Sequence, residues 1–163
     1  MELVECEIGR LIISETQESP TLVMLREKGG KRTLTIGIHI VEAIAINRKL
    51  SNESFPRPMT HDLLKSILDG LGVTVQQVVV NDLKDNTFFA VIELNHTGTI
   101  INIDARPSDA IALALRVNAP IFVTEKVVSQ AKSVEISEEK EETDKWREWL
   151  DNLKPEDFGK YRM

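Results

Sequence analysis

Two segments of this 163-residue chain, 67 positions apart, pass in the same way from a strand pattern to a helix pattern. They are residues 34–46 (LTIGIHIVEAIAI) and residues 101–113 (INIDARPSDAIAL). In each, apolar residues first alternate, as in a half-buried strand, and then recur at helical spacing. The apolar runs at 22–25 and 89–92 match at the same offset. The spacing predicts two copies of a unit made of three strands and a helix.

The other elements are expected around these two units. The strands occur in hairpin-linked groups, which predicts an α+β fold with a mainly antiparallel sheet. A further helix is expected from Thr60, which would be its N-cap, to a glycine end at Gly72. Five apolar residues of this helix recur on one face and predict a buried stripe: Leu63, Leu64, Ile67, Leu68 and Leu71.

Composition favours a folded domain at residues 1–132. Hydrophobic residues make up 42% of the chain, and no apolar run is long enough to span a membrane. Cys6 is the single cysteine, so neither an internal disulfide nor a thiolate zinc cluster is possible. The first residues lack the pattern of a signal peptide, and the default expectation is a reducing, cytoplasmic setting.

Residues 133–163 differ in composition and predict an acidic, amphipathic helical tail. Residues 135–163 hold ten acidic and six basic side chains, which accounts for −4 of the net charge of −6 and leaves −2 for residues 1–134. Trp146, Trp149, Leu150 and Leu153 recur at helical spacing, as in a helix that docks on its own domain or on a partner subunit. Because no basic stripe is present, any nucleic-acid role must depend on a local patch or on metal-bridged phosphates.

Strong catalytic and cofactor motifs are missing from the sequence. It contains no phosphate-binding GxxxxGK[ST] loop, GxGxxG, HExxH, GxSxG or CxxC. No organic cofactor is therefore expected, and an enzymatic function must be carried by looser groups of residues.

The first such group is Arg57, Thr60, His61 and Asp62, just before and within the start of a helix. Arginine can bind a phosphate through two hydrogen bonds, and histidine can act as a general acid or base near neutral pH. The alternative is structural: Thr60 and Asp62 would only cap the helix, and His61 would be solvated.

The second group is Asp104, Arg106, Ser108 and Asp109, where a strand turns into a helix at Pro107. Carboxylates at such a turn can hold Mg²⁺ or Mn²⁺. The alternative is that Asp109 caps the helix, as Glu42 would in the first copy, that Asp104 accepts a hydrogen bond in the turn, and that Arg106 pairs with one of these two aspartates. Since only the second copy carries Asp104 and Arg106, these two are the stronger functional candidates. Lys84, in a polar turn, forms a third and weaker group with its neighbours.

Three motifs together resemble the bifunctional nuclease family of bacteria and plants. They are FPRPMTHDLL, NDLKDNTFFAVI and IDARPSDAIALALR, followed by NAPIFV, and the resemblance covers residues 1–130. It implies a compact, duplicated α+β domain, a homo-oligomer, and in some members degradation of both DNA and RNA. The strand at 34–39 departs from the LPIWIG pattern common in the family.

The resulting hypothesis is a cytoplasmic, Mg²⁺- or Mn²⁺-dependent nuclease of low sequence specificity acting on DNA and RNA. The roles assigned are general acid or base for His61, with Asp62 beside it; metal binding for Asp104 and Asp109; and phosphate or substrate binding for Arg57, Lys84, Arg106 and Ser108. The alternative is a non-catalytic or regulatory module that binds a partner protein or a small anionic ligand through the same turns.

Overall fold

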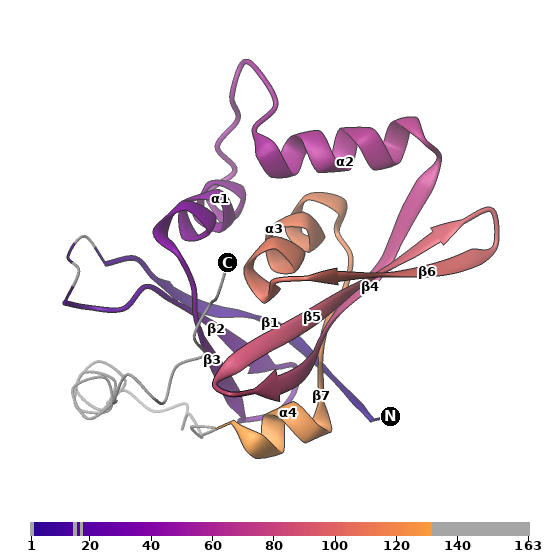
Figure 1. Cartoon of the computed structure of the whole chain (residues 1–163). Helices are drawn as coiled ribbons and strands as arrows, with labels where there is room; N and C mark the ends of the chain where they lie inside the picture. The colour runs from indigo at the N-terminus through magenta and orange to yellow at the C-terminus, as the bar shows by residue number, and fades with distance from the viewer. Residues whose placement is uncertain (1, 15, 17, 132–163) are drawn as a thin grey trace.

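The computed structural model describes residues 2–14, 16 and 18–131 of the chain (Figure 1). Its helices and strands occur in the order β1 (Leu3–Ile12), β2 (Leu22–Glu27), β3 (Thr33–Gly37), α1 (Ile40–Leu50), α2 (Thr60–Gly70), β4 (Val73–Lys84), β5 (Thr87–His96), β6 (Thr99–Ala105), α3 (Pro107–Val117), β7 (Ile121–Thr124) and α4 (Glu125–Gln130). None of these helices is long and apolar enough to span a membrane. The predicted tail lies outside the described residues, and its helical character remains a prediction.

All seven described strands form one sheet, in the order β3-β2-β1-β7-β4-β5-β6. Every neighbouring pair is antiparallel except β4 and β7, which are parallel. The α+β class and the mainly antiparallel sheet are thus confirmed. A group of three strands and a helix occurs twice in chain order, and α1 and α3 begin and end 67 positions apart.

Turn chemistry sets the end of β4. Asp85 and Asn86 have φ angles of 49° and 59°, the left-handed conformation that a two-residue hairpin turn requires at both central positions. The strand therefore continues to Lys84, which pairs with Thr87 across the hairpin. Lys84, expected in a polar turn, is the last residue of the strand.

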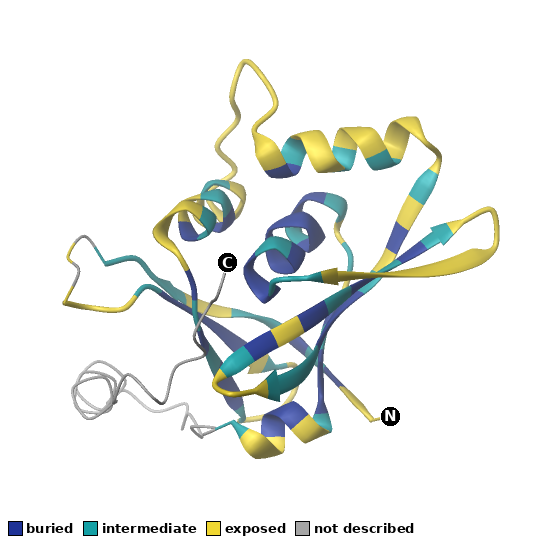
Figure 2. Cartoon of the chain, viewed as in Figure 1, coloured by how far each residue is buried: buried dark blue, intermediate teal, exposed yellow. Residues whose placement is uncertain are grey.

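The helix α3 lies at the centre of the fold. Ala110, Ile111, Ala112 and Ala114 are at most 1% exposed, so the helix is buried on nearly all sides. It contacts α1 and α2 as well as β4 and β5. Figure 2 shows it in dark blue along most of its length. A helix apolar all round must be enclosed, which explains the unbroken Ala, Ile and Leu sequence after Pro107.

The helix α2 corrects two expectations. Four of the five residues in its predicted buried stripe are exposed, namely Leu63 at 51%, Leu64 at 41%, Ile67 at 49% and Leu71 at 65%. Figure 2 shows the contrast between this mostly yellow helix and α3. Thr60 is the first helical residue and not the N-cap, which is Met59. The backbone N–H of Met59 donates to the Asp62 carboxylate at 3.0 Å, so Asp62 satisfies the end of the helix.

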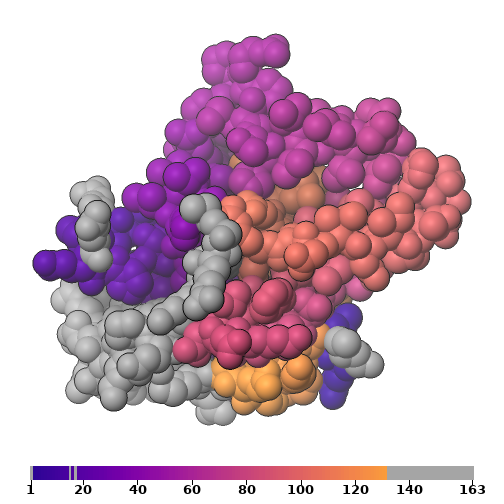
Figure 3. Space-filling model, in the orientation of Figure 1, coloured from indigo at the N-terminus to yellow at the C-terminus, as the bar shows by residue number. Residues whose placement is uncertain are grey.

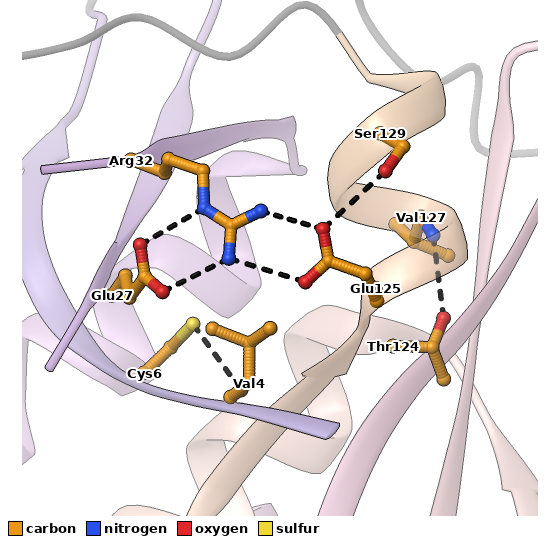
Figure 4. Close-up of polar contacts among 8 residues, drawn as sticks. All are labelled: Val4, Cys6, Glu27, Arg32, Thr124, Glu125, Val127 and Ser129. Atoms are coloured by element: carbon orange, nitrogen blue, oxygen red, sulfur yellow. Dashed lines mark hydrogen bonds and ion pairs between the residues drawn. The ribbon is translucent and has the colours of Figure 1, made fainter. Parts of the chain in front are cut away.

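A cluster of charged side chains joins the β2–β3 hairpin to α4, at the end of the domain away from α2. The Arg32 guanidinium, after the β2–β3 turn, donates to Glu27 and to Glu125 of α4 at 2.6–3.1 Å (Figure 4). These hydrogen bonds hold the pKa of both carboxyl groups below the ordinary value, because each ionised form is the better acceptor. The cluster connects the hairpin to the helix that follows β7.

We expect Ile111→Ala to lower the free energy of unfolding by about 2–5 kcal/mol. The side chain of Ile111 is fully buried, so its truncation leaves a cavity beside α3. Urea unfolding followed by circular dichroism measures the change. The control is Ile100→Ala on β6, where the side chain is 51% exposed and the expected loss is below about 1 kcal/mol. Equal losses would show that α3 is not the centre of the core.

Candidate functional site

Three helices bring polar side chains together near their N-termini. His61 comes from α2, Glu42 from α1, and Arg106 and Asp109 from the start of α3. His61 Nε2 lies 2.9 Å from Asp109 Oδ1, and Arg106 Nε donates to Asp109 Oδ2 at 2.8 Å. Arg106 Nη2 donates to Glu42 Oε1 at 2.9 Å. The four side chains therefore form one connected network.

The Asp109 carboxylate is the centre of this network. Burial raises its pKa, but the hydrogen bonds from His61 and Arg106 outweigh that effect and hold the pKa below the ordinary value. Since Asp109 is then ionised at neutral pH, Nε2 of His61 carries the proton that it shares. Nδ1 of His61 is left as the nitrogen that can exchange a proton with another group.

Capping does not explain Glu42 and Asp109, contrary to the expectation from the repeat. Asp109 occupies the third position of α3, as predicted, but both its oxygens bind side chains. Glu42 pairs with Arg106, and the His39 side chain accepts no capping hydrogen bond in α1. The oxygen Oε2 of Glu42 is buried without a hydrogen-bond partner among the described residues. The two acids that the copies share thus bind one arginine.

A second ion pair fixes the start of α2 against α3. Arg116 Nε donates to Asp62 Oδ1 at 2.8 Å, and the remaining guanidinium nitrogens donate to the carbonyl oxygens of Ala112 and Ala45. The Arg116 side chain is 6% exposed. Asp62 also binds the N–H of Met59, and both interactions lower its pKa. Asp62 therefore holds the start of α2 beside the network.

The network lies in the wall of a cavity of about 930 Å³ between α1, α2 and the β5–β6 ribbon. In Figure 3 the surface is hollowed below α2, above the β6 strand. Much of the wall is apolar, with contributions from Ile44, Ile67, Leu94 and Ile103. The arrangement combines a small ionic cluster with a wide apolar surface.

The cavity unites five of the eight predicted site residues: His61, Asp62, Asp104, Arg106 and Asp109. The two turns predicted from sequence therefore share one cavity. The other three are not part of its lining. Arg57 is exposed in the α1–α2 loop, Ser108 is 1% exposed, and Lys84 pairs with Asp82 at the end of β4 away from α2.

Sequence reasoning missed Glu42 and Arg116 as members of the site. Glu42 has the spacing of a helix cap, and Arg116 lies near the end of a mostly apolar helix. A charged residue at the end of an otherwise apolar, enclosed helix must find a partner, and this signal could have identified Arg116.

The predicted metal ligands do not form a metal centre held by the protein alone. Asp104 and Asp109 both line the cavity, but the oxygens of Asp109 already accept from His61 and Arg106. No group of three or more His, Cys, Asp or Glu residues suited to hold a metal ion occurs in the described part of the chain. These residues do not fit a preformed centre, and we derive no step through a metal ion.

The family model of the bifunctional nuclease domain matches residues 23–136, which is more than half of the chain. The chain therefore belongs to this family, and the resemblance seen in the three motifs is confirmed. All five cavity-lining candidates lie inside the matched region.

Relatives of two kinds are similar to this chain. An uncharacterised protein of Mycobacterium tuberculosis is 37% identical, over 94% of this chain and 97% of its own length. Bifunctional nuclease 2 of Oryza sativa is 29% identical over 68% of this chain but 35% of the plant protein. Bifunctional nuclease 1 of Arabidopsis thaliana is also 29% identical, over 64% of this chain and 33% of the plant protein. The chain thus spans about a third of each of these plant relatives.

We expect Arg106→Met to lower the free energy of unfolding by about 2–3 kcal/mol, because it leaves the mostly buried Glu42 carboxylate unpaired beside Asp109. The double variant Arg106→Met/Glu42→Met should recover at least half of this loss, since the buried Glu42 carboxylate is gone and Asp109 keeps its hydrogen bond with His61. Urea unfolding measures both. The matched control is Arg57→Met in the exposed loop, with a change below about 0.5 kcal/mol. Additive losses in the double variant would contradict the pairing.

We expect Asp109→Asn to be less stable than the wild type by about 1–3 kcal/mol at neutral pH. The pKa of Asp109 is lowered by folding, so this contribution is complete above the ordinary aspartate pKa of about 3.9. It is lost as the pH falls through the lower folded pKa. Urea unfolding of both proteins from pH 7 to pH 3 tests this. A difference that widens toward pH 3 would be incompatible with it, and Asp69→Asn, at an exposed pair with Lys65, is the control.

Proposed function

We propose that this protein is a nuclease that hydrolyses phosphodiester bonds of DNA and RNA with low sequence specificity. Membership of the bifunctional nuclease family supports the reaction class. The observation that carries the residue assignment is the His61–Asp109 pair in the cavity wall, beside Arg106. A base, an acid that orients it and a cation are the groups that such a hydrolysis uses.

His61 is the proposed general base. It would accept a proton at Nδ1 from the water that attacks phosphorus, and the bond from phosphorus to the leaving ribose or deoxyribose oxygen would break. Asp109 would hold the imidazole in one tautomer and stabilise the positive charge that forms on it. The leaving oxygen would take its proton from solvent or, in a later step, from His61.

Arg106 is the proposed phosphate-binding residue. Its contacts with Asp109 and Glu42 use Nε and Nη2, so Nη1 can donate to a phosphate oxygen. The side chain is 30% exposed, which leaves it accessible from the cavity. Asp104, exposed on β6, stays a proposed metal contact together with substrate phosphates. Substrate roles for Arg57, Lys84 and Ser108 outside the cavity remain predictions.

Three further properties belong to the same proposal. They are dependence on Mg²⁺ or Mn²⁺, a homo-oligomeric state and a cytoplasmic location. The proposed proton transfer to His61 needs no metal ion, so a chelator separates the two hypotheses. Retained activity in the chelator would remove the metal from the proposal and leave His61 in it.

The second candidate is a non-catalytic binding module. It is favoured by the largely apolar cavity wall and by the full pairing of the Asp109 oxygens. Such a site would take a partner protein, or a small anion bound by Arg106. The nuclease assay separates the candidates, because this module would leave both nucleic acids intact while variants at Arg106 still lose binding of the ligand.

We expect the purified full chain to degrade single-stranded DNA and RNA, and His61→Ala to lower kcat/KM at least about 100-fold, the usual contribution of a general base. Asp109→Asn should also lower kcat/KM, because it removes the carboxylate that orients the imidazole. Assays with Mg²⁺, with Mn²⁺ and with a chelator are run in parallel, and circular dichroism confirms that each variant is folded.

The matched control is His96→Ala, which removes an exposed histidine at the end of β5. It should degrade both substrates at the wild-type rate. Activity that is equal in the wild type and in the His61 and Asp109 variants would identify a contaminating nuclease and reject the site. No activity under any condition would favour the binding module.

A further inference from the structure

The described part of the chain leaves one wall of the cavity without a packing partner. On α2, Leu64 and Ile67 line the cavity and are 41% and 49% exposed, and Ile103 of the edge strand β6 is 44% exposed. Val41 and Ile44 of α1 continue this surface at 69% and 38%. We call these five residues the apolar groove. Contiguous exposed apolar residues of this kind mark a binding site for another segment.

The chain itself carries a segment that fits this groove. Trp146, Trp149, Leu150 and Leu153 follow the i, i+3, i+4, i+7 spacing of a helix that presents one apolar face. An amphipathic helix laid into a hydrophobic groove is a recurring mode of recognition. We propose that residues 146–153 of this chain dock as a helix in the apolar groove between α1, α2 and β6.

The connecting chain is long enough to reach. Residues 132–145 can span up to about 45 Å when extended, whereas a compact domain of this size is about 35–40 Å across. Figure 1 shows that α4, where the description ends, lies at the opposite end of the domain from α2. The linker can therefore bridge the two ends within one copy, or join two neighbouring copies.

One further observation supports this occupant. The mycobacterial relative matches 94% of this chain, so at most about ten residues are unmatched and most of the tail lies within the similarity. The proposal does not depend on nuclease activity, although a docked helix would cover the side of the cavity that holds His61 and Arg106.

Tryptophan fluorescence tests the proposal in the full chain, because both tryptophans lie in the segment that is proposed to dock. We expect a blue-shifted emission that acrylamide quenches weakly. Ile67→Lys in the groove, and separately Leu150→Asp in the tail, should each shift the emission to that of the urea-unfolded chain. Since Leu150→Asp leaves residues 2–131 unchanged, it also covers the case in which Ile67→Lys disturbs folding.

The groove variant and the tail variant each have a matched control. Leu63→Lys adds the same charge on the same helix at 51% exposure, but Leu63 does not line the cavity. Asn152→Asp adds the same charge as Leu150→Asp on the polar face of the tail. Both should keep the wild-type emission. If docking occurs between copies, dilution shifts the emission; if it occurs within one copy, dilution has no effect.

Two results would overturn the proposal. One is a wild-type emission that already equals that of the unfolded chain. The other is a blue-shifted emission that Ile67→Lys leaves unchanged, which would place the tail elsewhere. In the second case, light scattering that shows Ile67→Lys to dissociate an oligomer would assign the groove to a second copy of the domain.

Discussion

The pairing of Arg106 with Glu42 and Asp109 is the interaction on which the site depends. A single guanidinium at the start of α3 binds one acid on its own helix and one on α1. Through Asp109 it is linked to His61, and so to α2. Removing the cation would leave two carboxylates near each other in a mostly buried place, and charges of this kind are tolerated only when paired. One arginine therefore links three helices at the cavity, and the Arg116–Asp62 pair holds α2 against α3 beside it.

Much of the fold could be predicted from sequence, because it depends on periodicity and turn chemistry. The strand-to-helix change at Pro107 and the matching change within residues 34–46 both agree with the structure. Proline at the first helical position and left-handed turn residues are local signals. Such signals can be recognised in the sequence without knowledge of the tertiary structure.

The errors at the site and along α2 mostly concern what a side chain meets in space. Glu42 and Asp109 have the spacing of caps, and nothing local distinguishes a cap from an acid that binds a distant arginine. The apolar face of α2 has the spacing of a buried stripe, yet the described chain does not cover it. Only the structure shows that His61 and Arg106 share a cavity, because the two residues are 45 positions apart in the sequence and belong to different helices.

The position of β7 has a consequence for the order in which the chain can fold. This strand pairs with β1 on one side and with β4 on the other, so it joins the two halves of the sheet. Among the described residues it is also the last strand in sequence, at Ile121–Thr124. On the ribosome, β1, β2 and β3 would emerge more than 80 residues before the strand that connects them to β4. The sheet can therefore close only when synthesis of the domain is nearly complete, and until then two separate edges are open to pairing with other chains.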